Sequence, residues 1–97
     1  ATDKFIFLGF PPHKNKRKKY FEDLAKVEHT AVFYESNHRI HKTLADLNNV
    51  LKKDTLICIC RELTKKFESI YRGTIAQISV AGIPAKGEFV IVVDRNR

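Results

Sequence analysis

The chain alternates short apolar runs with longer stretches in which apolar residues recur every three or four positions. Runs of consecutive or alternating apolar residues predict five strands, at 4–10, 31–34, 56–60, 67–72 and 88–93. Helical spacing predicts three helices, over about 15–26, from 36 or 37 to about 52, and from Thr74 to near Gly82. The order β-α-β-α-β-β-α-β predicts an α/β fold, a two- or three-layer sandwich over a mostly five-stranded mixed sheet.

The hydrophobicity of the strands predicts where they lie in the sheet. The run at 4–10 is nearly continuous, which favours a strand buried on both faces, and the β-branched run at 88–93 favours a central strand. Cys58 and Cys60 point to the same face of their strand, and no metal ligands stand at suitable spacing. We therefore expect two reduced cysteines packed in the core. After the cap residue Thr74, we expect Ile75, Ile78 and Val80 to point inward, toward the core.

Two strands end in abrupt polar turns. Thr30–Arg39 passes from an apolar run into five polar residues, and 61–66 repeats this change after the next strand. Open α/β sheets bind ligands outside the carboxyl ends of their strands, so these turns are candidate binding sites. Their similarity indicates that both lie at one sheet edge and form one wall of a cleft. They are also compatible with helix capping by Ser36 or Asn37.

Composition and charge narrow the class of protein. The 97 residues are 43% hydrophobic and 30% charged, which favours one folded domain and excludes disorder. No apolar run approaches the ~20 residues of a membrane span, and no signal-peptide pattern opens the chain, so we expect a cytoplasmic protein without a membrane partner. The chain has no Met, which indicates that the native start is missing or removed.

A net charge of +7 favours a polyanionic partner such as nucleic acid. Much of the excess lies in one segment at the start of the first predicted helix, comprising Lys14, Lys16, Arg17, Lys18 and Lys19. Cations are disfavoured at a helix N-terminus, which indicates another reason for their presence there. The alternative is a solvated charged face.

Standard chemistry motifs are absent from the sequence: it has no phosphate loop, nucleophile elbow or zinc spacing. Glu35 and Glu62 are candidate general bases if buried, but each has an arginine nearby with which it can pair, Arg39 or Arg61. His38 and His41 lack a third ligand and are interpreted as surface residues. Tyr34 is either a core residue or a platform for a ligand.

Four segments carry a resemblance that goes beyond these patterns. They read F-I-F-L-G-F-P-P, F-Y-E-S-N-H-R-I-H-K-T-L-A-D-L, R-E-L-T-K-K-F-E-S-I-Y-R-G-T-I-A-Q-I and K-G-E-F-V-I-V-V. Together they resemble the C-terminal domain of the bacterial small-subunit ribosomal RNA cytidine 2′-O-methyltransferases, of the tetrapyrrole methylase superfamily (class III methyltransferases). The resemblance covers almost the whole chain, although Asn37 stands where that family often has Pro.

The resemblance implies a two-domain enzyme that uses S-adenosylmethionine in a cleft between its domains and is typically a homodimer. Residues 1–97 would form the C-terminal half, without the N-terminal domain and inactive alone. The implied substrate is ribosomal RNA or the small ribosomal subunit. A stand-alone nucleic-acid-binding module and a domain of a tetrapyrrole methylase stay open as alternatives.

The resemblance also implies roles for individual residues. The family-motif turns comprise Glu35, Ser36, His38, Arg39, Thr64, Glu68, Arg72 and Gly73. Tyr34, Arg61 and Glu62 are candidates for the cofactor. Arg39, Arg61 and Lys65 join the basic segment as candidates for RNA phosphate. The catalytic group is not identified; the candidates are Glu35, Glu62 and Lys65.

Overall fold

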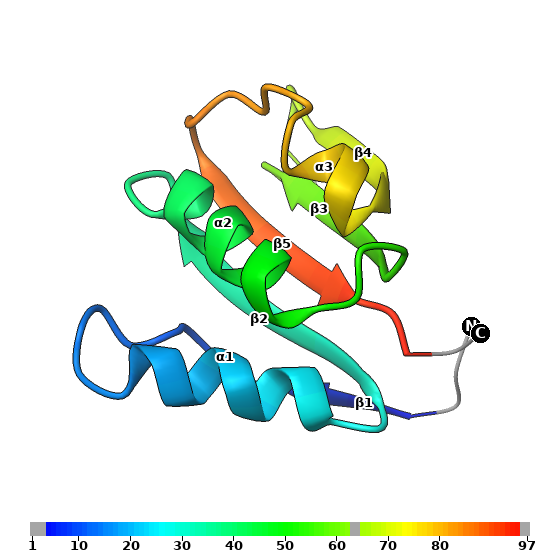
Figure 1. The fold of residues 1–97 in the computed structure, drawn as a ribbon. Helices are drawn as coiled ribbons and strands as arrows, with labels where there is room; N and C mark the ends of the chain where they lie inside the picture. Colours follow the sequence, from blue (N-terminus) through cyan, green and yellow to red (C-terminus); the bar gives the residue numbers. More distant parts are fainter. Residues whose placement is uncertain (1–3, 63–64, 96–97) are drawn as a thin grey trace.

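A computed structural model describes residues 4–62 and 65–95, in which five strands and three helices follow the predicted order (Figure 1). The elements are β1 Phe5–Phe7, α1 Arg17–Lys26, β2 Thr30–Ser36, α2 Ile40–Val50, β3 Leu56–Arg61, β4 Ser69–Thr74, α3 Ile75–Ile78 and β5 Glu88–Val93. Within residues 4–62 and 65–95, none of the helices has the length and hydrophobicity of a membrane span.

The five strands form one mixed sheet in the order β1-β2-β5-β3-β4. The last strand of the chain is therefore central, as its β-branched sequence predicts. β1 and β2 pair in parallel, whereas β5 runs antiparallel to both of its neighbours, β2 and β3. Since β2 and β3 thus run in the same direction, both end at the same edge of the sheet.

The fold is a two-layer sandwich, because α1, α2 and α3 all cover one face of the sheet (Figure 1). Alternate residues of the central strands point into this layer. Phe33, Ile59 and Ile91 are fully buried there, against Phe21 and Leu47 of the helices. This arrangement decides between the two- and three-layer architectures that the sequence allows.

The other face of the sheet has no helix over it, and two predictions fail for that reason. Phe5 and Phe7 are 67% and 51% exposed, so β1 is not buried on both faces. Cys58 and Cys60 are free thiols, as predicted, but they lie partly exposed on this open face and not in the core. An apolar run marks a strand but does not indicate whether a second layer covers it.

The helix ends confirm one predicted cap and contradict another. Thr74 accepts a hydrogen bond from the Gln77 amide, and the Gln77 side chain accepts one from the Thr74 amide. Neither Ser36 nor Asn37 caps α2, which begins only at Ile40 and has no side-chain cap. Val80, expected to point inward, lies beyond α3 and is 82% exposed.

The open face predicts that both cysteines react in the native protein. Their sulfur atoms are 3.8 Å apart, and burial together with Cys58 raises the pKa of Cys60 to about 11. We expect a maleimide to modify both thiols without denaturant, with the rate at Cys60 still rising as the pH increases through 9, because thiolate is the reactive form. Mass spectrometry of the native chain checks this, with Cys58→Ser and Cys60→Ser as single-site controls. Modification only after unfolding would contradict the open face.

Candidate functional site

The two polar turns lie on either side of the start of β5. In the sheet register, Phe89 pairs with Glu35 of β2 on one side and with Arg61 of β3 on the other. The loop after β1 joins them, because the Tyr34 amide donates to the Gly9 carbonyl at 2.8 Å. Three strand ends therefore meet at one edge of the sheet, as the two similar turns predicted.

A hollow of about 670 Å³ lies at this edge. We call it the strand-end pocket; its lining residues are Phe10, Tyr34, Glu35, Ser36, Asn37, Gly87, Glu88, Phe89 and Val90. Tyr34 is 42% exposed, and its ring packs edge-on against Phe7 and Phe10 with centroids 5.0 and 5.5 Å away. Tyr34 therefore lies on the open face and not in the core.

Glu35 is buried, but its carboxylate is fully engaged in holding the fold. One oxygen accepts a hydrogen bond from the Thr43 hydroxyl at 2.5 Å. The other accepts from the Ser36 amide at 2.8 Å and lies 3.4 Å from Nε of Arg39. This pairing with Arg39 is the alternative that the sequence left open, and it ties β2 to α2.

Glu62 is engaged in a comparable way on the other side of β5. Its backbone is left-handed (φ 56°), and its amide donates to the Glu88 carbonyl at 2.8 Å. Its carboxylate accepts from the Glu88 amide at 2.7 Å, and Nζ of Lys65 lies 3.5 Å away. The hydrogen bond from Glu88, more than the charge of Lys65, lowers the pKa of Glu62.

Gly87 is a site residue that sequence reasoning missed. It has a positive φ of 81°, and a Cβ there would collide with the Glu62 carboxylate. The glycine thus leaves room for Glu62 to reach the start of β5. A glycine directly before the last strand was the available sign.

The other predicted residues divide between the pocket and more distant positions. Arg61 donates to the Ser69 hydroxyl at 3.2 Å, and neither Arg61 nor Glu62 lines the pocket. His38 and His41 are exposed, as predicted. Thr64 lies outside the described residues. Glu68 is exposed just before β4, away from the pocket lining.

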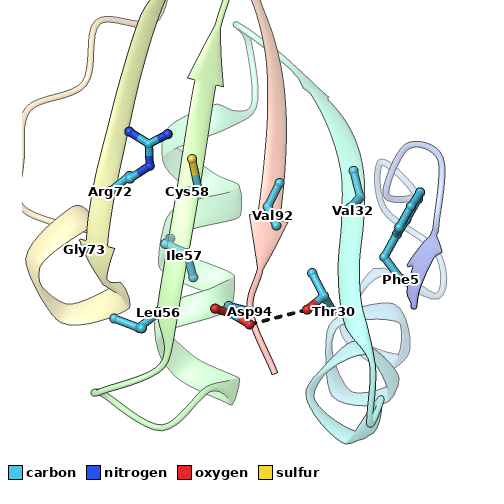
Figure 2. A pocket seen from close by; sticks show the side chains of 10 residues that line it. All are labelled: Phe5, Thr30, Val32, Leu56, Ile57, Cys58, Arg72, Gly73, Val92 and Asp94. Atoms are coloured by element: carbon cyan, nitrogen blue, oxygen red, sulfur yellow. Dashed lines mark hydrogen bonds between the residues drawn. The ribbon is translucent and has the colours of Figure 1, made fainter. Parts of the chain in front are cut away.

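Arg72 and Gly73 line a second hollow, of about 470 Å³, at the opposite end of the open face (Figure 2). The Thr30 hydroxyl donates to Asp94 at 3.4 Å across its lower end. None of the predicted catalytic residues lies there. The family-motif residues thus do not form one site on this chain.

The basic segment divides as well. Lys14, Lys16, Lys18 and Lys19 are exposed, whereas Arg17 is only 5% exposed. Lys16 has a left-handed backbone (φ 66°) directly before α1, and Lys19 pairs with Asp23 at 3.1 Å. Four cations therefore face solvent, and one is internal. Among the residues that the structure describes, no cluster of three potential metal ligands occurs.

Comparison with known proteins gives the family. Residues 2–79 match the family described as Tetrapyrrole (Corrin/Porphyrin) Methylases. The chain belongs to this family. Its fold matches that of the cobalamin biosynthetic enzyme cobalt precorrin-4 methyltransferase, with a TM-score of 0.67 and 24% identity, over 96% of this chain and 41% of the other. Uroporphyrin III C-methyltransferase from Thermus thermophilus matches with a TM-score of 0.65 and 8% identity, over 95% and 40%.

Closer relatives in sequence are named ribosomal RNA small subunit methyltransferase I. The protein of Haemophilus influenzae is 40% identical over 97% of this chain and 35% of its own length. Those of Synechocystis sp. and Mycoplasma genitalium are 40% and 42% identical, over 96% and 98% of this chain and 34% of their own lengths. The chain spans about a third of the relatives it matches.

For this member of the tetrapyrrole methylase family, the contacts of Glu62 predict that the pKa of its carboxyl group is measurably lowered. We expect NMR titration of the side-chain carboxyl to give a pKa below the ordinary value of 4.5. Since the folded pKa is lowered, the associated stability is present above the unfolded pKa and is lost as the pH falls through the folded one. Lys65→Gln should reverse only part of the shift, because the Glu88 amide is the larger cause. A pKa at or above 4.5 would contradict the described turn.

Glu35→Gln should destabilise the domain although it hardly changes the volume of the side chain. The amide cannot accept from both Thr43 and Ser36 as the carboxylate does and has no charge to pair with Arg39, so we expect the free energy of unfolding to fall by about 1.5–3 kcal/mol. Urea denaturation checks the change, with exposed Glu28→Gln as the matched control. Equal stability of both variants would show that the Glu35 contacts contribute little.

Proposed function

We propose that this chain is the C-terminal part of an S-adenosylmethionine-dependent methyltransferase that modifies small-subunit ribosomal RNA. The observation that carries the proposal is about 40% identity, over nearly the whole chain, to proteins named for that activity. The +7 charge and the exposed lysines before and within α1 favour RNA over a tetrapyrrole substrate. The group modified would be the 2′-hydroxyl of a cytidine ribose, and the complete enzyme would be a cytoplasmic homodimer.

The strand-end pocket fits one side of a nucleoside cofactor. Tyr34 and Phe10 offer exposed aromatic surface for an adenine or for a sulfonium cation. The Glu88 carboxylate, at the pocket rim, can accept hydrogen bonds from ribose hydroxyls. When bound, S-adenosylmethionine supplies the activated methyl group. The pocket is open on its outer side, and we propose that the segment the relatives have in addition closes it.

The residues of this chain would act mainly by placement. Arg61 and Glu62 stand across β5 from Tyr34, so they would shape the pocket through the start of β5. Glu35 has its carboxylate engaged with three groups and would hold the turn, not accept a proton. Lys65 is exposed and remains the better placed of the three catalytic candidates to meet RNA. Fixing the ribose hydroxyl beside the methyl donor would supply much of the rate.

The direct test is methyl transfer by a protein that joins this chain to the additional segment of the relatives, which we propose precedes it. We expect it to transfer a labelled methyl group from S-adenosylmethionine to small-subunit RNA, and the 97-residue chain alone to transfer none. Nuclease digestion and mass spectrometry would locate the label on a cytidine ribose. Label in a corrin or porphyrin, or none in RNA, would contradict the proposal.

RNA binding by the exposed lysines has its own prediction. In Lys14→Ala/Lys16→Ala/Lys18→Ala, we expect weaker binding to a single-stranded fragment of small-subunit rRNA. The slope of log K against log salt should flatten by about 0.7 for each phosphate that the variant no longer neutralises. Lys26→Ala/Lys42→Ala/Lys52→Ala removes the same charge from exposed positions elsewhere and is the control. Equal slopes in the two triple variants, measured by fluorescence anisotropy, would remove the segment from the RNA interface.

A further inference from the structure

Arg17 lies within the basic segment in sequence but is internal in the structure. Its side chain is 6% exposed, and its Cζ lies 5.0 Å from the centre of the Phe21 ring. All three guanidinium nitrogens donate: Nε to Asp46 at 2.9 Å, Nη1 to the Pro12 carbonyl at 2.9 Å and Nη2 to Thr43 at 2.8 Å. Three of its five N–H groups are bonded inside the protein, and its low exposure leaves no accessible edge for an RNA phosphate.

The contacts of Arg17 continue to the strand-end pocket. The Thr43 hydroxyl accepts from Arg17 and donates to Glu35, and Glu35 accepts from the Ser36 amide. Glu35 and Ser36 both line the pocket. Thr43 is 0% exposed and Glu35 2%, so no water competes for these bonds. One buried chain of hydrogen bonds therefore runs from the start of α1 to the end of β2.

The same guanidinium fixes the loop after β1. Its bond to Pro12 holds the chain two residues beyond Phe10, which lines the other side of the pocket. The neighbouring Lys16 and Lys18 are exposed on the same turn of chain. Arg17 thus sets the position of the exposed lysines relative to two walls of the pocket.

We propose that Arg17 is a positioning residue, not an RNA contact: it fixes the lysine-bearing start of α1 against the turn that forms the strand-end pocket. The part that concerns RNA rests on the proposed function; the part that concerns the turn does not. Lysine cannot replace Arg17, because an ammonium lacks the planar fork that reaches Pro12, Thr43 and Asp46 together.

The first arm of the test measures the turn itself, by amide hydrogen exchange in the 97-residue chain. We expect Arg17→Lys and Thr43→Val each to speed exchange at Ser36 by roughly three- to tenfold, the range expected when one or two hydrogen bonds are removed. The amides of Ile59 and Ile91, in the buried central strands, should change their exchange rates only as far as the overall stability of each variant changes. Thr43→Ser keeps the hydroxyl, so exchange at Ser36 in this variant should be as slow as in the unmodified chain.

The second arm separates positioning from phosphate contact by salt dependence. We expect Arg17→Met and Thr43→Val to weaken binding of the single-stranded rRNA fragment roughly three- to tenfold at a temperature where each is fully folded, with an unchanged salt slope. Lys18→Gln should lower both the affinity and the slope. Because Arg17 and Thr43 act in one chain of bonds, the double variant should lose little more affinity than either single one.

The outcomes distinguish this inference from the proposed function. Unchanged exchange at Ser36 in both single variants would overturn the positioning role, whatever the RNA result. A flatter salt slope in Arg17→Met, with the Thr43→Val slope unchanged, would show direct phosphate contact and overturn it as well. If the joined protein transfers no methyl group to RNA, the proposed function fails, and selective loss of protection at Ser36 still supports the positioning role.

Discussion

The insertion of β5 between β2 and β3 is the constraint on which the rest of the structure depends. β5 runs antiparallel to both neighbours, so β2 and β3 run in the same direction. Although they are separate in sequence, these two strands therefore end at the same edge of the sheet. The first residues of β5 then stand between the two polar turns, where the Glu88 backbone bonds to Glu62 on one side. A pocket at this edge is a consequence of strand order, and Gly87 supplies the space that the arrangement requires.

The buried polar chain on the helical side determines how that edge is shaped. A carboxylate inside a protein is costly unless it is hydrogen-bonded and paired with a positive charge. Glu35 accepts hydrogen bonds from Thr43 and Ser36 and is paired with Arg39. The hydroxyl of Tyr20 is buried without a hydrogen-bond partner among the described residues. Its pKa is raised, mainly by burial and to a smaller extent by the negative charge of Glu35. Such a network favours one arrangement of α1, α2 and β2 and holds the Glu35 turn in place.

The sequence was sufficient to predict the strands and helices and their order, because the spacing of apolar residues and the helix cap at Thr74 are local features. It also located both polar turns, and the shared edge followed from similar strand ends. It did not show the open face, because the exposed Phe5 and the partly exposed Cys58 are as apolar as core residues. Nor did it separate Arg17 from its neighbouring lysines, since burial of a cation depends on partners such as Thr43 and Asp46, 26 and 29 residues away.

The central claim is that the edge of the sheet around β5 forms one wall of a methyl-transfer site. The most direct measurement is a crystal structure, with S-adenosylhomocysteine, of this chain joined to the additional segment of its relatives. The account predicts that the ligand lies against Tyr34 and the residues at the start of β5. A ligand that contacts only the additional segment, or that occupies the hollow beside Arg72 at the opposite end of the sheet, would contradict it.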